Sequence, residues 1–267
     1  MTAASPFDGT IVVVAPHMDD ETLGCGLLLS QHPSKQSAHV VFATDGASSP
    51  VPGHGRGERS RDLAGVRKAE VLEALAVLGI PAANAHFLGL PDGELARYST
   101  QLGAALIDRF SALRPKWVFV PFRYDRHPDH LAVNRVVCGA SRSGALDSGI
   151  FEYFVYSQWR LLPAGDVRAY LAADDCIRLH ADDGGARKRD ALTRHRSQTT
   201  RLFDWQTRPV LTPQLIDRVC TEPEVLLRYD AARTGHRVLR RGRTWIPIAH
   251  LVEPALKHWK DRLAGVA

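Results

Sequence analysis

Residues 15–21 read APHMDDE, which places a histidine, two aspartates and a glutamate directly after the apolar run IVVV at 11–14. Removing such side chains from water costs free energy, so packing alone gives little reason to gather them where a buried strand meets a loop. A divalent cation would offset that cost, because imidazole nitrogens and carboxylate oxygens are its usual protein ligands. We therefore interpret the segment as part of a metal site.

A second group of metal-binding residue types, RYDRHPDH at 123–130, follows the apolar run KWVFVPF. His17 and Asp20 lie three positions apart on a tight loop, so both can face one point, and His130 from the second group completes a set of three ligands. Three protein ligands and one open position are typical of a catalytic zinc. Asp19 then stays free to accept a proton from the water molecule in the open position. Either motif alone would be weak, so the interpretation depends on their occurring together.

These two groups need a scaffold that brings the ends of separate strands together. The sequence predicts strands at 11–14, 38–44, 85–90 and 116–122 and helices at 21–32, 61–80 and 100–113. Repeated βα units of this length imply a parallel sheet with helices on both faces. The fold class is therefore α/β, a doubly wound, Rossmann-like and mainly parallel sheet. Ligands of such sheets bind at the carboxyl ends of the strands, where both polar groups fall.

The pattern weakens beyond residue 150. It predicts further strands at 150–159 and 167–179, a helix at 185–198 and an amphipathic helix at 245–266. Because no linker-like composition separates these elements from the first half, we treat residues 1–267 as one domain. The last helix is expected to pack on its own domain, with contact to a membrane surface or to a second copy of the chain as the alternatives.

The composition excludes several classes of protein. With 45% hydrophobic and 24% charged residues the chain is an ordinary globular protein. The net charge of +5 arises largely from basic runs at 186–201 and 233–243, and such runs usually mark a solvent-exposed face. Since no RNP, zinc-finger or helix-turn-helix signature is present, we expect no nucleic-acid partner. No secretory signal and no spanning apolar stretch are apparent, so we expect a cytoplasmic chain without an integral membrane segment.

The pair APHMDDETLGCG and RHPDHLAV resembles the LmbE-like, or PIG-L-like, zinc-dependent N-acetylglucosaminyl deacetylases, whose hallmark is an HPDDE motif followed by HPDH. TDG, FLGLPDG and KRDALTRHRSQ are further matches, so the resemblance covers about residues 10–203 and leaves a C-terminal extension at about 204–267. Met18 stands where the family usually has proline, which relaxes the loop.

The resemblance implies a zinc ion held by His17, Asp20 and His130, with Asp19 as the general base. It further implies roles for residues that spacing alone does not assign. Protonated His127 would stabilise the oxyanion or donate to the leaving amine, with Asp129 orienting it; Arg67 and Asp92 would contact the substrate, and His195 would serve in a supporting role. For Arg67 the alternative is an ordinary surface arginine, and for Asp92 an ordinary turn residue.

The resulting expectation is a hydrolase with one Zn²⁺ per chain that removes an N-acetyl or other small N-acyl group from a glucosamine-containing small molecule or glycoconjugate. Fe²⁺ can use the same ligands in the cell. The alternatives are an amidase acting on a different N-acyl amine, a metallophosphoesterase, or a non-catalytic sugar-binding member of the fold. A dinucleotide oxidoreductase is excluded because no GxGxxG follows a strand. The acceptor, the acyl chain length and whether the chain is a homo-oligomer stay open, and specificity is expected to lie in residues 47–61 and in the region after 200.

Overall fold

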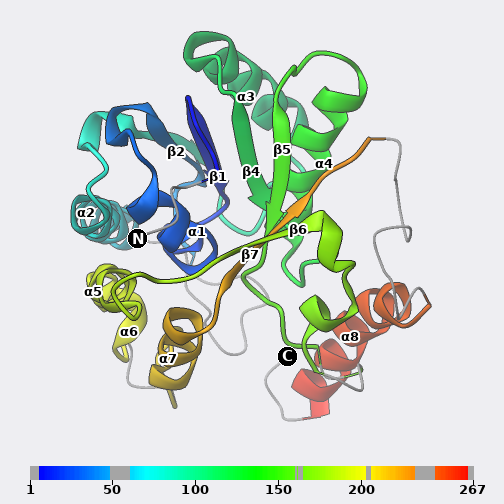
Figure 1. Cartoon of the computed structure of the whole chain (residues 1–267). Coiled ribbons are helices and arrows are strands. Elements are labelled where there is room, and N and C mark those ends of the chain that lie inside the picture. The colour runs from blue at the N-terminus through cyan, green and yellow to red at the C-terminus, as the bar shows by residue number, and fades with distance from the viewer. Residues whose placement is uncertain are drawn as a thin grey trace.

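A computed structural model describes residues 6–48, 61–159, 161, 165–202, 206–231 and 244–263 (Figure 1). The strands are β1 (Ile11–Ala15), β2 (Ala38–Thr44), β3 (Ala85–Leu90), β4 (Trp117–Pro121), β5 (Gly149–Tyr153), β6 (Cys176–Leu179) and β7 (Glu224–Arg228). The helices are α1 (Asp20–Gln31), α2 (Arg61–Leu78), α3 (Ser99–Leu113), α4 (Pro128–Arg142), α5 (Ala186–Thr193), α6 (Arg196–Thr199), α7 (Pro213–Thr221) and α8 (Trp245–Leu263).

The strands form one sheet in the order β3-β2-β1-β4-β5-β7-β6. Strands β1 to β5 pair in parallel, and β7 runs antiparallel to both of its neighbours, β5 and β6. The expected α/β fold with a mainly parallel sheet is confirmed. Successive strands are added on one side of β1 and then, from β4 onward, on the other. The chain therefore reverses direction across the sheet between β1 and β4, which is where open α/β sheets bind their ligands.

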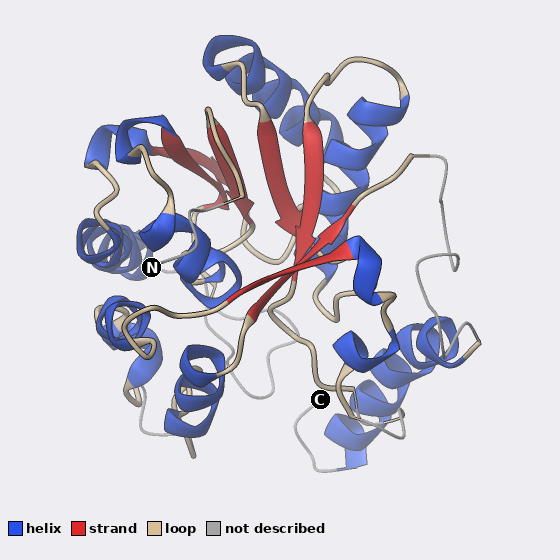
Figure 2. Ribbon diagram, viewed as in Figure 1, coloured by secondary structure: helices blue, strands red, loops and turns tan. Residues whose placement is uncertain are grey.

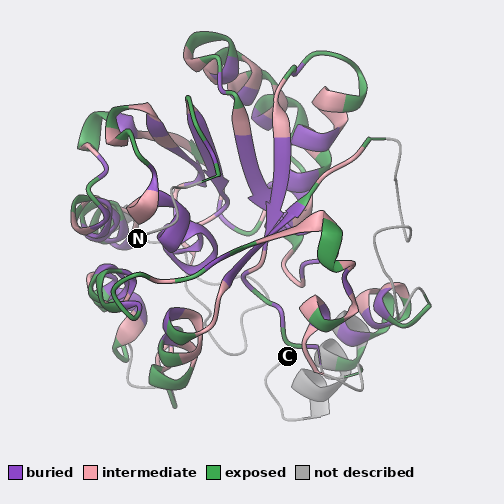
Figure 3. Cartoon of the chain, in the orientation of Figure 1, coloured by how far each residue is buried: buried purple, intermediate pink, exposed green. Residues whose placement is uncertain are grey.

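Helices cover both faces of the sheet (Figure 2). One core lies under α1, α2, α5 and α7 and includes Val13 and Phe42, whereas the other lies under α3 and α4 and includes Val12 and Val14. Because successive residues of a strand point to opposite faces, β1 is buried on both and reads as an unbroken apolar run. Figure 3 shows the central strands as the buried part of the molecule. Among the described residues, no helix has the length and apolar character needed to cross a bilayer.

The second half of the chain differs in detail from the sequence predictions. The strand predicted at 150–159 ends at Tyr153, and the one predicted at 167–179 is a strand only over Cys176–Leu179, after two short 3-10 turns. The helix predicted at 185–198 is two helices, because the backbone leaves the helical region at His195 (ψ 62°). Strand β7 was not predicted; it lies between β5 and β6, so residues beyond 203 supply an inner strand of the sheet.

Helix α1, which begins with Asp20, is broken in its middle. The backbone of Cys25 departs from helical geometry (φ −136°, ψ 17°), and a buried ion pair takes the place of the missing helical hydrogen bonds. Lys188 Nζ donates to the carbonyl of Leu23 (2.8 Å) and to Glu224 Oε2 (2.7 Å). The carboxylate of Glu224 accepts in turn from the backbone N–H groups of Leu27 and Leu28, at 2.7 and 2.9 Å.

The two glycines of the GCG segment allow this close packing. A Cβ on Gly24 would stand 2.2 Å from Cδ2 of Tyr153, and a Cβ on Gly26 would stand 3.0 Å from Cγ of Lys188. Tyr153 is itself fixed, because its hydroxyl donates to the carbonyl of Val14 at 3.0 Å. These glycines therefore serve the approach of two side chains to the helix rather than the approach of a nucleotide.

Candidate active site

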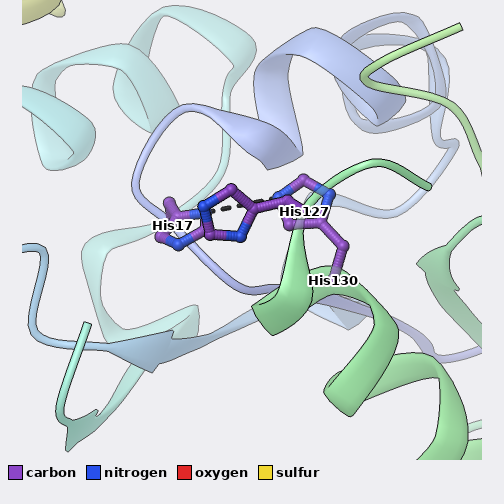
Figure 4. A group of neighbouring side chains, drawn as sticks. All are labelled: His17, His127 and His130. Carbon is purple, nitrogen blue, oxygen red and sulfur yellow. Dashed lines mark hydrogen bonds between the residues drawn. The ribbon is translucent and has the colours of Figure 1, made fainter. Parts of the chain in front are cut away.

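The two polar groups of the sequence meet at the carboxyl ends of β1 and β4. His17 lies in the loop after β1, and His127 and His130 lie at the start of α4; Figure 4 shows their three rings gathered at one point. Pro128 occupies the first position of α4, where a missing N–H costs nothing, and His127 precedes it as the N-cap. The local sequence thus starts a helix whose first turn faces the loop after β1.

Three potential metal-ligand atoms, one from each residue of the predicted ligand set, form a small triangle. Asp20 Oδ2 lies 3.1 Å from His17 Nδ1 and 3.1 Å from His130 Nε2, and the two nitrogens are 3.3 Å apart. A tetrahedral zinc with ligands at about 2.0–2.1 Å separates its ligand atoms by about 3.3–3.4 Å. The residues therefore fit one small divalent ion. A nitrogen of His127 also lies within 4.8 Å of nitrogens of His17 and His130, but a contact described below occupies its Nδ1.

A carboxylate stands behind each of the two histidines of the triangle. His17 Nε2 lies 3.2 Å from Asp129 Oδ2 and 3.3 Å from Asp92 Oδ1, while His130 Nδ1 lies 3.2 Å from Asp125 Oδ1. Such pairs fix the tautomer and orientation of a ligating imidazole and increase its basicity. Because His17 Nε2 is hydrogen-bonded to Asp129 and His130 Nδ1 faces Asp125, the other ring nitrogen of each histidine is directed into the triangle.

The charges within the triangle oppose the effect of burial. Burial lowers the pKa of His17, but hydrogen bonds with Asp129 and Asp20 outweigh it and raise that pKa well above its usual range. Burial likewise lowers the pKa of His130, and the carboxylates of Asp125 and Asp20 raise it to about 10. Burial raises the pKa of Asp20, whereas the two histidines hold it well below its usual range. The carboxylates thus favour the protonated form of histidines that burial alone would leave neutral.

Asp19 is adjacent to Asp20 but points elsewhere. It is the N-cap of α1, yet its side chain makes no capping hydrogen bond; Oδ2 accepts instead from Nε2 of Gln198 at 2.8 Å. Burial, together with the neighbouring charge of Asp20, raises the pKa of Asp19 to about 7. A carboxyl group of that pKa, 7% exposed and outside the ligand triangle, is suited to exchange a proton near neutral pH.

His127 differs from the sequence expectation in its protonation. Its Nδ1 accepts the backbone N–H of Asp129 at 3.2 Å, so the proton of the neutral ring is on Nε2. Burial and the neighbouring His17 and His130 lower the pKa of His127 to about 3. This geometry favours a neutral ring that offers the Nε2–H as its donor, and the expected role of a protonated His127 stays a prediction.

The carboxylate of Asp129 also differs from expectation, because it does not face His127. Besides His17 it accepts the backbone N–H groups of Gly93 (2.7 Å) and Leu95 (3.0 Å) in the loop after β3. Only the backbone of Asp129 contacts His127. Asp129 thus joins the loops after three strands and orients His17, while its N–H sets the tautomer of His127.

Arg67 and Asp92 lie beside the ligand triangle, each 8% exposed. Arg67, from α2, donates to the carbonyl of Gly46 at 2.8 Å and lies 3.6 Å from Asp92 Oδ2. Asp92 Oδ2 accepts from the backbone N–H of Ser48 at 3.1 Å, and its Oδ1 faces His17. Both side chains therefore already have protein partners that support the loops after β2 and β3.

Three residues at the site were not identified from the sequence. Asp125 lies within the segment RYDRHPDH and Gln198 at the end of KRDALTRHRSQ, and neither motif by itself indicates a role for them. Tyr156, three residues after the end of β5, is 42% exposed, and its ring centroid lies 5.5 Å from that of His130. Position after a strand was the available signal for Asp125 and Tyr156; no pattern signalled Gln198. Of the predicted specificity segments, residues 49–60, 203–205, 232–243 and 264–267 lie outside the described residues.

Comparisons with known proteins point to one family. Residues 12–141 match the family described as PIG-L: GlcNAc-PI de-N-acetylase. The 1D-myo-inositol 2-acetamido-2-deoxy-alpha-D-glucopyranoside deacetylase of Mycobacterium sp. (strain KMS) is 30% identical over 234 residues, covering 70% of this chain and 73% of the relative.

Solved structures share the fold. The N,N'-diacetylchitobiose deacetylase of Pyrococcus horikoshii has a TM-score of 0.61 at 18% identity, covering 84% of each chain. The conserved protein TT1542 of Thermus thermophilus has a TM-score of 0.57 at 24% identity, covering 82% of this chain and 94% of that one. At these identities the likeness concerns the fold alone.

Proposed function

The chain belongs to the PIG-L family, and from that premise we propose that it is a metal-dependent hydrolase that removes an N-acetyl, or another small N-acyl, group from a glucosamine-containing small molecule or glycoconjugate. The mycobacterial relative is named as a deacetylase of an acetamido-glucopyranoside. The observation that carries the proposal is the triangle of His17, Asp20 and His130 with the carboxyl group of Asp19 beside it, because a merely structural ion has no use for a further acid next to its ligands.

In this proposal His17, Asp20 and His130 hold one Zn²⁺, or Fe²⁺ in the cell, which when bound polarises the acyl carbonyl and lowers the pKa of a water molecule. Asp19 takes the proton of the attacking water. Its Oδ2 is held by Gln198, so Oδ1 is the oxygen left to accept. Asp19 then delivers that proton to the leaving amine nitrogen as the C–N bond breaks, so that the carboxylic acid and the free amine are released.

His127 donates from Nε2 to the carbonyl oxygen as negative charge develops on it. The backbone N–H of Asp129 keeps this tautomer, since it occupies Nδ1. A neutral donor directed at the developing oxyanion stabilises the transition state more than the substrate, and removing such a donor typically costs about 100- to 1000-fold in rate. The carboxylate of Asp129 supports the reaction indirectly by holding His17.

The sugar is proposed to bind beside Arg67 and Asp92. Arg67 contributes a positive charge there and is held by the carbonyl of Gly46 and by the nearby carboxylate of Asp92. Asp92 contributes mainly by holding the loop and His17. The remaining candidates are an amidase acting on another N-acyl amine and a non-catalytic sugar-binding protein; the placement of Asp19 argues against the second.

The test is acetate release from a panel of N-acetylglucosaminides by the wild type and by Asp19→Asn. Loss of a general base typically lowers the rate by about 100- to 10,000-fold. Asp217→Asn is the matched control, because Asp217 is an exposed carboxylate on α7 that pairs with Arg189. The proposal predicts release by the wild type and the control and a strong loss in Asp19→Asn. Equal release by all three proteins, or release by none from any sugar, would contradict it.

A further inference from the structure

Gln198 forms a hydrogen bond with Asp19, the proposed base, and no sequence pattern indicated this contact. Its side-chain nitrogen lies 2.8 Å from Asp19 Oδ2, and the two side chains are 4% and 7% exposed. A carboxylate only accepts hydrogen bonds, so the amide must present its NH₂ group to Asp19. The Oε1 atom of Gln198 is consequently turned away, and it has no hydrogen-bond partner among the described residues.

The side chain of Asp19 binds Gln198 and does not cap helix α1. An aspartate at an N-cap ordinarily accepts a backbone N–H from the first turn of its helix, and such a cap stabilises by about 1 kcal/mol. Here the backbone N–H groups of Thr22 and Leu23 donate to the main-chain carbonyl of Asp19, and its side chain caps nothing. The carboxylate is therefore held away from the helix terminus and beside the ligand triangle.

The turn that carries Gln198 is fixed on three sides. Ser197 donates from its backbone N–H (2.9 Å) and hydroxyl (2.7 Å) to the buried carboxylate of Glu70 on α2. Arg196 pairs with Glu73 through two hydrogen bonds of 2.9 Å each. The carbonyl of Gln198 accepts from the N–H of Leu211 at 2.8 Å. The amide thus reaches Asp19 from a rigid support and not from a freely rotating side chain.

From these contacts we infer that Gln198 is a positioning residue for the proposed reaction: it holds Oδ2 of Asp19, keeps the carboxylate from capping α1 and leaves Oδ1 directed at the attacking water. This inference rests on the proposed function for the role of Asp19 as base. Packing alone does not account for the contact, because a buried amide with one unpaired polar atom costs about 1–3 kcal/mol. The orientation of the Asp19 carboxylate accounts for the presence of this buried amide.

The kinetic test replaces Gln198 with Met, which has a similar length and no donor. Loss of an orienting partner of this kind typically lowers activity by about 10- to 100-fold, and we expect the fall in kcat with KM changed by less than about twofold. Bound zinc per chain should stay at the wild-type value, since no ligand is altered. Gln206→Met is the matched control: Gln206 is also buried, and its amide contacts the backbone of Leu202 and not Asp19. A kcat for Gln198→Met equal to that of the control would overturn the inference.

A crystal structure of metal-free Gln198→Met supplies a readout that does not depend on activity. We expect the carboxylate of Asp19 to have turned to the backbone N–H of Glu21 or Thr22, and an unmoved Asp19 would overturn the inference. Should Gln198→Met fail to fold, Gln198→Asn retains the buried amide one carbon short of Asp19 and is expected to give the same two results. A wild type inactive on every sugar would refute the proposed function, while the position of Asp19 in the variant would still decide the role of Gln198.

Discussion

Replacing Lys188 with Met is expected to remove a large part of the stability of the fold. Lys188 is 1% exposed, and its ammonium bridges the break in α1 by binding the carbonyl of Leu23 and the carboxylate of Glu224. Met fills the volume of the lysine stem, which packs against Gly26, so the change removes chiefly the charge and its two hydrogen bonds.

The size of the effect follows from what the substitution leaves behind. The carboxylate of Glu224 remains buried with only the N–H groups of Leu27 and Leu28 as partners, and the Leu23 carbonyl loses the lysine donor. Removing one member of a buried ion pair costs about 3–5 kcal/mol, because the other charge is left uncompensated. A second change, Glu224→Gln, removes that charge, so the double variant should be more stable than the sum of the single changes by about 0.5–3 kcal/mol.

The assay is urea unfolding of the wild type, the two single variants, the double variant and a matched lysine control. Lys35→Met is that control, because Lys35 Nζ donates to the carbonyls of Leu29 and Ser30 in the same helix and has no carboxylate within ion-pair distance among the described residues. We expect the control to lose about 1 kcal/mol. A loss in Lys188→Met within about 1 kcal/mol of the control would refute the view that a buried charge pair holds the broken helix together.

Three further changes test separate contacts. Gly24→Ala should lower the free energy of unfolding by at least about 3 kcal/mol, because its Cβ would stand 2.2 Å from the fixed ring of Tyr153; Gly65→Ala, whose Cβ meets nothing within 4 Å, should be neutral or stabilising. Asp129→Asn should weaken zinc affinity by about 10- to 100-fold in a chelator competition, and unchanged affinity would show that His17 needs no such partner. His195 is fully buried, and burial together with Arg67 lowers its pKa to about 4. As the pH falls below about 6.5, the unfolded state binds a proton at this histidine before the folded state does, so the folded state loses stability between about pH 6.5 and 4. Over that range the free energy of unfolding of the wild type should fall by about 3 kcal/mol more than that of His195→Leu. Parallel pH profiles of the two proteins would contradict this.

The fold and the ligand set follow from local features of the sequence. Apolar runs such as IVVV mark strands buried on both faces, and polar clusters directly after two of them must meet at one edge of a parallel sheet. His17, Asp20 and His130 are proposed as ligands in this way, because His17 and Asp20 follow the end of β1 and His130 lies in the first turn of the helix after β4. The helix predicted at 61–80, which is observed at Arg61–Leu78, likewise depends on local features: its own apolar spacing and Gly79 after its last residue.

The remaining features depend on contacts between distant parts of the chain. The carboxylate of Asp129 faces His17 because the loop after β3 presents the N–H groups of Gly93 and Leu95, which no pattern around HPDH reveals. His127 is neutral because it is buried beside two other histidines. Gln198 reaches Asp19 across 179 positions of sequence. Strand β7 is five residues long and pairs antiparallel with β5 and β6, both of which lie far from it in the sequence.

The most direct test of the central claim is a calorimetric titration of the metal-free protein with zinc, comparing the wild type, His130→Ala and Asp19→Asn. Asp19 lies next to a proposed ligand in sequence but outside the triangle formed by His17, Asp20 and His130. We expect one ion per chain in the wild type, loss of affinity in His130→Ala, and near-wild-type stoichiometry in Asp19→Asn despite its loss of activity. Undiminished binding by His130→Ala, or loss of binding in Asp19→Asn, would contradict the assignment of ligands and base.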